Sequence, residues 1–365
     1  MRIAHVTAPA QFGGAERVIA GLTEALAKAG HEVSLVLTLT PGSSVPRWVE
    51  AVVRAGVQVD PVYASARSYL GERTAVQNIL RERRVELIHS HGYRSDILHA
   101  GLASRGTPPR VSSAHGFAST DARGRLYQWL QLRAWRACDA VIAVSEPLHA
   151  ALVQAGLSPD RVVLIPNSLP PGGTAQVLSR ASARATLGLP ADGAIVGWVG
   201  RFSEEKDPLG MIRAFAQSGS LESRLCMLGS GPLDNACRAA ATAEGLGDRV
   251  LFPGAVADAG VVFPAFDVLA LSSRTEGTPM VVLEAARVGV PVVATAVGGV
   301  PALLGDDAGW LVPAADPQAL AAALDTALGE RAESMRRAAK LAERLEGKAV
   351  SWLESHVRLY ERLLA

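Results

Sequence analysis

Two glutamates eight residues apart, Glu276 and Glu284, flank a short loop and the expected start of a helix. Gly277 to Pro279 form a loop with a proline suited to a first helical position, so the helix is expected to begin near Pro279. Glu276 then precedes the helix and can accept hydrogen bonds from sugar hydroxyls, while Glu284 can reach a ribose diol. The helix-start N–H groups, with Gly277 and Thr278 in the loop, can receive a diphosphate. This segment therefore suits a ligand that carries both hydroxyl groups and a diphosphate.

Two basic side chains follow an apolar run in the same half of the chain. Arg201 and Lys206 are expected just beyond a strand, where a guanidinium can grip phosphate oxygens as a fork and an ammonium adds a compact point charge. The chain has only four lysines against 32 arginines, which makes Lys206 more informative. Glu204 and Glu205 are adjacent, so ordinary surface charge stays open as the alternative.

Two glycine-containing turns each follow a predicted strand and precede a predicted helix. One contains Gly13 and Gly14, and the other contains Gly229 and Gly231. Glycine allows close approach of the backbone, and free N–H groups at a helix start attract phosphate. Neither turn has the GxGxxG spacing, which argues against an NAD-dependent oxidoreductase. A turn without a ligand remains the alternative at both places.

Histidines follow two predicted strands of the first half. His115 can hydrogen-bond a substrate hydroxyl or the reacting region, although a histidine at a strand end is often only structural. His91, with Tyr93 and Arg94, occupies a similar place. We assign these three residues to the side of the site that would bind a second substrate, the acceptor.

The elements that must position these residues alternate between short apolar runs and helix-length segments, typical of parallel sheets covered by helices. In the first half the expected strands are Ile3–Thr7, Val33–Thr38, Leu87–His89, Val111–Ala114, Val141–Val144 and Val162–Ile165. In the second half they are Ile195–Val199, Arg224–Leu228, Val250–Phe252, Val268–Leu271, Pro291–Thr295 and Trp310–Val312. The expected helices include Ala15–Ala29, Glu72–Arg83, Leu126–Ala137 and Ala349–Leu364.

A proline- and glycine-rich cluster at 166–173 separates the two series and predicts a domain boundary. We expect one domain over 1–170 and a second over 171–349, each a doubly wound α/β unit. Ligands of such sheets bind beyond the carboxyl ends of the strands, so the two domains should face a shared cleft lined by these loops.

Composition limits the classes of function. Lys and Arg total 36 against 35 Asp and Glu, so no global field attracts nucleic acid. The first 170 residues carry a net charge of +5, which suits an anionic acceptor or membrane surface, or a merely solvated surface.

Three cysteines without a CxxC pair favour a reducing, cytoplasmic setting without disulfides or a zinc site. No signal peptide or spanning segment is indicated. The segment 123–136 mixes arginine with Trp and Leu and could lie on an anionic bilayer or be a core helix with an arginine rim.

The ordered set of motifs resembles the family 4 retaining glycosyltransferases of GT-B fold, over essentially the whole chain. The matching motifs are GGAER near the start, His115-Gly116, Ser145-Glu146, Pro166-Asn167, Gly200-Arg201 with Lys206, the GSGP turn, the Glu276 to Glu284 element and Val297 to Pro301. Ser168 and Ala302 depart from the family pattern, in which Gly and Glu are frequent. The resemblance implies that residues 350–365 pack back on the first domain and that Gly14 lets the donor β-phosphate approach.

It also implies roles for the other matching residues. Arg201 and Lys206 would neutralise the diphosphate, Glu276 would bind hydroxyls of the donor sugar, and Glu284 would bind the ribose. His115 would contact the sugar near the reaction centre. The expected reaction moves a sugar from a nucleotide diphosphate sugar, UDP favoured over GDP, to a hydroxyl of a glycan, lipid-linked sugar or small molecule.

No Asp-x-Asp sequence is present to hold a divalent metal, so we expect transfer without a metal or other cofactor, with positive side chains and helix-start N–H groups stabilising the leaving group. A same-face attack assisted by the leaving phosphate is the preferred mechanism for retention. Two alternatives stay open: a nucleotide-sugar 2-epimerase of the same fold, and a non-catalytic nucleotide- or sugar-binding protein.

Overall fold

The computed structural model describes residues 1–9, 13–65, 68–116 except 101–106, 122–170, 177–256 and 258–365. Contacts between Cα atoms divide the chain into two compact units. Unit 1 comprises Met1–Gly172 together with Lys348–Ala365, and unit 2 comprises Gly173–Gly347. Residues 171–176, where the sequence predicts the boundary, lie outside the described ranges.

Unit 1 contains a seven-stranded, all-parallel sheet in the order β3-β2-β1-β4-β5-β6-β7. Its strands are β1 (Arg2–Thr7), β2 (Glu32–Leu39), β3 (Gln58–Tyr63), β4 (Leu87–His91), β5 (Arg110–Ala114), β6 (Ala140–Ala143) and β7 (Val162–Leu164). The sequence analysis missed β3 because Asp60 and Pro61 interrupt its apolar run. β3 is an edge strand of this sheet, the place in a sheet where proline is tolerated.

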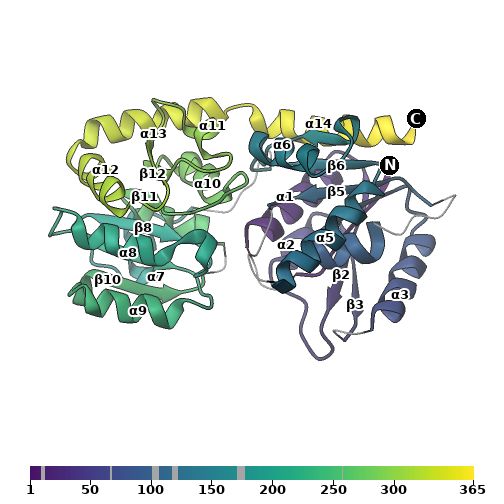
Figure 1. The fold of residues 1–365 in the computed structure, drawn as a ribbon, viewed down its shortest axis with the longest axis horizontal. Coiled ribbons are helices and arrows are strands. Elements are labelled where there is room, and N and C mark those ends of the chain that lie inside the picture. The colour runs from purple at the N-terminus through teal and green to yellow at the C-terminus, as the bar shows by residue number, and fades with distance from the viewer. Residues whose placement is uncertain (10–12, 66–67, 101–106, 117–121, 171–176, 257) are drawn as a thin grey trace. The chain divides into compact units, whose positions relative to one another are not determined.

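Helices cover the unit 1 sheet (Figure 1). They are α1 (Gly14–Lys28), α2 (Val49–Arg54), α3 (Tyr69–Glu82), α4 (Tyr93–Ser95), α5 (Ala122–Arg136), α6 (Glu146–Gln154) and α14 (Lys348–Leu364), with the π-helix η1 (Asp96–Ala100) and the 3-10 helix η2 (Pro159–Arg161). The C-terminal helix α14 contacts α1, and the Tyr360 hydroxyl lies 2.7 Å from His89 Nδ1. The last helix thus belongs to the first unit although the whole of unit 2 precedes it in the chain.

A fully buried carboxylate anchors α5 to this sheet. Asp96 accepts hydrogen bonds from Ser90 Oγ at 2.6 Å and Ser112 Oγ at 2.7 Å, on neighbouring strands. Its other oxygen accepts from Gln131 Nε2 at 2.7 Å and Trp135 Nε1 at 3.1 Å, both on α5. Burial raises the pKa of Asp96, and the hydrogen bonds oppose that shift. The buried face of α5 is therefore tied to the strands that end in the histidine-bearing loops.

Unit 2 contains a six-stranded, all-parallel sheet in the order β10-β9-β8-β11-β12-β13. Its strands are β8 (Ile195–Val199), β9 (Arg224–Leu228), β10 (Val250–Gly254), β11 (Val268–Leu271), β12 (Val292–Thr295) and β13 (Trp310–Val312). Its helices are α7 (Arg180–Leu187), α8 (Pro208–Gln217), α9 (Asp234–Ala243), α10 (Met280–Val288), α11 (Val300–Leu304), α12 (Pro317–Gly329) and α13 (Arg331–Leu345). Short 3-10 helices are η3 (Glu204–Lys206), η4 (Gly247–Arg249) and η5 (Ala259–Ala265).

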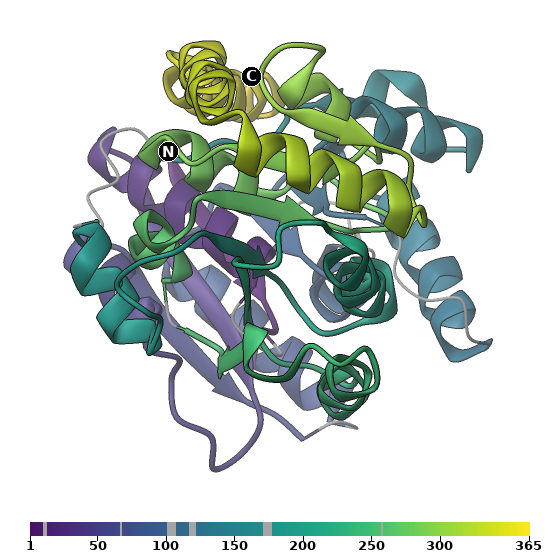
Figure 2. The same ribbon diagram turned by 90° about the vertical axis from the view of Figure 1, so that its left-hand side faces the viewer.

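Helices α8, α9 and α12 lie against this sheet (Figures 1 and 2). One apolar core fills the space between them and the sheet. Trp198, Phe215 and Met227 are among its buried members. The alternating pattern of the second half is thus a doubly wound parallel sheet, as predicted. The expected helix start near Pro279 is one residue early, since Pro279 has extended backbone angles and caps α10, which begins at Met280.

In both sheets the order of strands reverses once, between β1 and β4 in unit 1 and between β8 and β11 in unit 2. At such a switch point the loops after the two central strands run to opposite sides, which leaves a crevice at the carboxyl edge where ligands of open α/β sheets bind. Two of the predicted site loops of unit 2 follow β8 and β11, on either side of this point, and the third follows β9.

Among the described residues, no helix combines the length and the apolar character that a membrane span requires. The arginine-containing segment 123–136 lies in α5, whose Trp135 is buried while Trp129 and Leu126 are exposed. The Arg133 guanidinium lies over the Trp129 ring, 5.0 Å from its centroid.

Candidate functional site

An ion pair joins the two loops at the switch point of unit 2. Lys206 Nζ lies 2.7 Å from Glu276 Oε1 and 2.8 Å from Oε2, although the residues are 70 positions apart. Ser273 Oγ donates to Glu276 Oε1 at 2.6 Å. The Glu276 side chain is 6% exposed and that of Lys206 is 30% exposed. The carboxylate is thus held in place, while no described residue other than Glu276 contacts the ammonium, which leaves an N–H for a ligand.

Backbone contacts fix the loop that carries Lys206. Ser272 Oγ donates to the carbonyl oxygens of Lys206 at 2.9 Å and Asp207 at 2.8 Å. Asp207 has the left-handed backbone angle φ 45° and caps α8 by accepting from Gly210 N at 3.1 Å. A non-glycine residue in this region is strained, and it persists only where the surroundings determine it. The loop therefore presents Lys206 in one defined position.

Arg201, the other predicted phosphate-binding residue, is exposed. Its side chain forms no ion pair with any residue that the structure describes, so none of those residues compensates its charge. Lys206 and Arg201 differ in this respect, because Glu276 compensates the charge of Lys206.

The packing of unit 2 requires glycine at Gly229 and Gly231, the two predicted glycines of the loop after β9. A Cβ at Gly229, where φ is 139°, would lie 1.8 Å from the carbonyl oxygen of Gly200. A Cβ at Gly231 would lie 2.5 Å from the carbonyl oxygen of Phe202. These glycines bring the loops after β8 and β9 together, and that packing accounts for both positions.

The loop before α10, which contains Gly277 and Thr278, is also held by contacts within unit 2. Gly299 N donates to the Gly277 carbonyl at 2.8 Å, and Thr278 is buried. Glu284 on α10 is 2% exposed, and a Cβ at Gly260 of η5 would lie 3.3 Å from its carboxyl carbon. Glu284 thus lies on the inner side of α10 against η5.

In unit 1, the first predicted glycine turn begins α1. Gly13 is the residue before the helix, and Gly14 opens it. Glu16 Oε2 accepts from Gly13 N at 3.0 Å, which places a carboxylate at the helix start. Burial raises the pKa of Glu16. The N-terminus of α1, which attracts anions, is therefore already partly satisfied by the Glu16 carboxylate.

His91 and His115 lie near one another at the ends of β4 and β5. Their ring centroids are 6.0 Å apart and the rings are nearly parallel, with an interplanar angle of 27°. Burial lowers the pKa of His115 to about 4, so its imidazole is neutral at neutral pH. Its Nε2 has no hydrogen-bond partner among the described residues. This nitrogen can donate a hydrogen bond to a bound molecule or accept one from it, depending on the tautomer.

The other two acceptor-side residues, Tyr93 and Arg94, form the short helix α4. Arg94 donates to Glu72 through Nε at 2.8 Å and also through Nη2, and it lies over the Tyr69 ring at 5.4 Å. The Glu72 carboxylate also accepts from Thr38 Oγ1 at 3.0 Å. Arg94 is thus an internal ion-pair partner, a contact that sequence reasoning did not reveal.

Replacing Glu72 with glutamine is expected to lower the stability of the protein at pH 7 by about 2–3 kcal/mol, since Arg94 loses a buried charged partner. Burial raises the Glu72 pKa, but hydrogen bonds from His99, Arg94 and Thr38 outweigh it and hold the pKa at about 2. Because the folded pKa is lower than the usual 4.5, this stabilisation is complete above about pH 5 and is lost as the pH falls toward 2. Urea unfolding at several pH values measures the effect.

The matched control for that measurement is Glu82→Gln, which changes an exposed glutamate of the same helix. If Glu72→Gln retained the full acid-induced loss of stability between pH 5 and pH 2, Glu72 would not carry it.

Sequence reasoning missed His5 and His89, which are fully buried in β1 and β4. A signal was present, because His89 and His91 are two residues apart in one strand and so project from the same face. His5 could not be added to them without the pairing register, in which it lies directly opposite His89.

Models of two glycosyltransferase families match the chain in tandem. The model described as Glycosyltransferase Family 4 matches residues 12–171, and the model described as Glycosyl transferases group 1 matches residues 179–345. A D-inositol 3-phosphate glycosyltransferase of Kineococcus radiotolerans is 28% identical, over 92% of this chain and 87% of its own length.

Two solved structures share the fold over their whole length. Sucrose-phosphate synthase from Thermosynechococcus elongatus superposes with a TM-score of 0.83 at 23% identity, covering 100% of this chain and 99% of its own. Anabaena HepE in complex with UDP-glucose superposes with a TM-score of 0.86 at 20% identity, covering 99% of this chain and 100% of its own.

Proposed function

This chain is a family 4 glycosyltransferase that uses a nucleotide sugar, and from that premise we propose that it transfers a hexose from a UDP-sugar to a hydroxyl acceptor with retention and without a catalytic metal. The observation that carries the proposal is the Lys206–Glu276 pair at the switch point of unit 2. It places an ammonium for phosphate beside a carboxylate for sugar hydroxyls. UDP is preferred because the similar HepE structure contains UDP-glucose.

Each group has a distinct role in the proposed reaction. Lys206 and the exposed Arg201 stabilise the negative charge that develops on the leaving diphosphate, together with N–H groups at the start of α10. Glu276, held by Lys206 and Ser273, accepts hydrogen bonds from the donor sugar. His115, neutral at neutral pH, hydrogen-bonds a sugar hydroxyl, Glu284 binds the ribose, and Gly14 admits the β-phosphate.

In the transfer step the bond between the anomeric carbon and the β-phosphate oxygen breaks. The acceptor oxygen forms its bond to that carbon on the same face, and its proton passes to the departing phosphate oxygen. The configuration at the anomeric carbon is thereby retained. The acceptor is a hydroxyl of a glycan, a lipid-linked sugar or an inositol-type molecule, the last because the Kineococcus relative is named for D-inositol 3-phosphate.

The first test is a screen of UDP, GDP and several nucleotide hexoses by thermal shift, followed by NMR of product formed from the best donor and a set of acceptors. Binding to the folded state raises the melting temperature. We expect a larger shift with UDP than with GDP and an anomeric coupling of the donor type in the product. Formation of a C2 epimer from the donor alone would instead identify an epimerase, and an inverted product would contradict retention.

The metal-free part of the proposal predicts that kcat in excess EDTA changes less than about twofold when Mg²⁺ or Mn²⁺ is restored. These ions prefer oxygen ligands, and Arg201 and Lys206 supply the positive charge in their place. Initial rates of UDP release measure this. A tenfold or larger activation by either ion would contradict it.

Peripheral contact with an anionic membrane through α5 belongs to the same proposal, since Trp129 and Leu126 are exposed beside Arg133. Co-sedimentation with anionic liposomes tests it, and Trp129→Ser should weaken the association.

A further inference from the structure

Five of the eight histidines of the chain pack together in unit 1, on the sheet face that also contacts α14. Three of them, His5 of β1 with His89 and His91 of β4, bring ring nitrogens closest together, and these residues are 0–3% exposed. We call these three residues the histidine triad.

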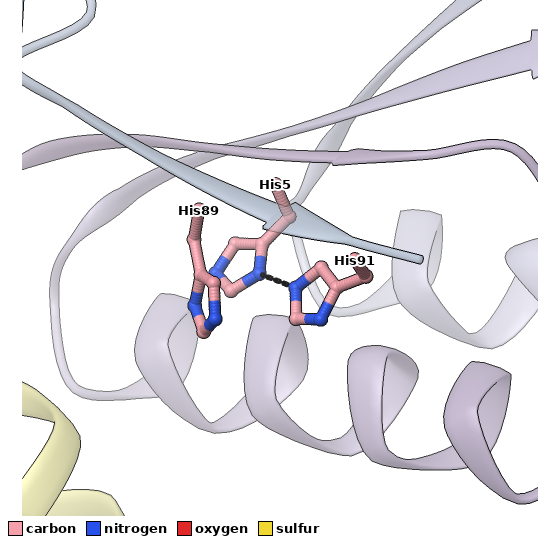
Figure 3. Close-up of side chains that lie close together, drawn as sticks. All are labelled: His5, His89 and His91. Atoms are coloured by element: carbon pink, nitrogen blue, oxygen red, sulfur yellow. Dashed lines mark hydrogen bonds between the residues drawn. The ribbon is translucent and has the colours of Figure 1, made fainter. Parts of the chain in front are cut away.

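The triad is built by strand geometry. His5 lies opposite His89 in the parallel register of β1 and β4, and His91 follows two residues later on the same face. Figure 3 shows the three rings turned toward one another from the two strands. His5 Nδ1 and His91 Nε2 are 3.0 Å apart, and one ring nitrogen from each of the three residues lies within 4.8 Å of the others.

Two triad nitrogens are unsatisfied within the part of the chain that the structure describes. His5 Nε2 and His91 Nδ1 are buried and make no hydrogen bond with any described residue. Buried polar atoms are nearly always satisfied. Each of these nitrogens can take up its ring's hydrogen when the other nitrogen of that ring binds a ligand. By contrast, His89 is satisfied at both nitrogens, by Tyr360 Oη at 2.7 Å and by Ser113 Oγ at 2.9 Å.

The triad is in the protonation state that metal ligands need. Burial, followed by repulsion from His356, lowers the pKa of His5 to about 3. Burial and the neighbouring histidines also lower the pKa values of His89 and His91 well below the usual range. All three imidazoles are therefore neutral at pH 7, and an imidazole ligates a metal only in this form.

We propose that His5, His89 and His91 bind one divalent transition-metal ion of the zinc type. The all-imidazole donor set suits Zn²⁺, Co²⁺, Ni²⁺ or Cu²⁺ and does not suit Mg²⁺ or Ca²⁺. Two nitrogens on a tetrahedral zinc at about 2.0–2.1 Å are roughly 3.3 Å apart. At present the two rings meet in line, with nitrogens 3.0 Å apart and an interplanar angle of 11°, so both rings must rotate for these nitrogens to converge on one ion.

Coordination would not need a net loss of protons. One of the two facing nitrogens of His5 and His91 now carries the shared hydrogen. On metal binding, that hydrogen moves to the other nitrogen of the same ring, which at present contacts no described residue. His89 can ligate through Nε2 in place of its contact with Ser113 and keep its Nδ1 contact with Tyr360 as support from α14.

The site would join β1 to β4 and, through Tyr360, both strands to α14. The site rests on residues of unit 1, and its test measures ion binding, which is read separately from the proposed sugar transfer. The catalytic prediction above concerns Mg²⁺ and Mn²⁺, which this donor set does not favour.

The experiment is titration of Co²⁺ into the full-length protein after removal of metals by chelation and exchange into chelator-free buffer. We expect one Co²⁺ per chain, with intense visible d–d absorption typical of a tetrahedral site, and displacement of Co²⁺ by Zn²⁺. Zn²⁺ at a hundredfold excess over its dissociation constant should raise the melting temperature by about 5 °C. Calorimetric titration in two buffers of different ionisation enthalpy should show release of fewer than about 0.3 protons per ion at pH 7.5.

Variants locate the ion. His91→Ala should weaken Co²⁺ binding at least about 100-fold, and His5→Gln should do so at least about tenfold. His149→Ala, which removes a histidine of α6 outside the cluster, should leave the affinity unchanged. Absence of the d–d bands in the wild-type protein overturns the proposal even if a variant fails to fold. Equal affinity in the wild type and the folded His91→Ala variant also overturns it, since the ion would then bind elsewhere.

Discussion

Glu276→Ala should lower kcat about 100- to 1000-fold while leaving the dissociation constant for UDP unchanged or slightly smaller. The carboxylate interacts with the sugar, which UDP alone lacks, so its removal should affect transfer and not nucleotide binding. The structure adds a second reason. Lys206 directs two contacts, at 2.7 and 2.8 Å, to this carboxylate, and the substitution would release its ammonium for phosphate. Steady-state kinetics and calorimetric titration with UDP measure the two quantities.

Two further variants sharpen this prediction. Glu276→Gln keeps the size and hydrogen-bonding capacity but removes the charge, and we expect activity between that of the wild type and that of the alanine variant. Glu205→Ala removes an exposed glutamate from the neighbouring loop and should retain normal kinetics. Transfer within threefold of the wild type in a folded Glu276→Ala variant would exclude the assigned role.

Lys206→Ala should lower activity as much as Glu276→Ala or more. It should impair both UDP binding and sugar transfer. The substitution removes positive charge from the phosphate site and leaves the 6% exposed Glu276 carboxylate without its cation. That carboxylate would then repel the diphosphate in the ground state and in the transition state. We expect UDP affinity to fall at least about tenfold and kcat/KM to fall about 1000-fold. Lys340→Ala, a lysine of α13 near Asp307, is the control.

The double variant distinguishes this electrostatic account from simple loss of a contact. Removing Glu276 from the Lys206→Ala background removes the unpaired carboxylate, so UDP should bind more tightly to the double variant than to Lys206→Ala. Such non-additivity is expected only for groups that interact. Strictly additive losses in UDP affinity would show that the two side chains act separately, despite their contact.

The architecture was predictable from the sequence because its signals are local. In parallel sheets buried on both faces, each strand is a short continuous apolar run, and both predicted series correspond to observed strands. The exception, β3, carries Pro61 at an edge, the place in a sheet where proline is tolerated, and this residue breaks the usual apolar signal. Glycine and proline likewise indicated the loops at strand ends, because those residues act on their own backbone angles.

The partners of the site residues were decided by tertiary structure. Lys206 and Glu276 meet because β11 lies beside β8 in the sheet, although two strands come between them in the chain. Arg94, assigned to the acceptor from its position after a strand, is held by Glu72 of a helix that precedes that strand. The histidine triad depends on a register that pairs His5 with His89. A local pattern specifies which residues lie at a strand end, but which charges and rings face each other depends on strand order and register, and these are set by the packing of the whole unit.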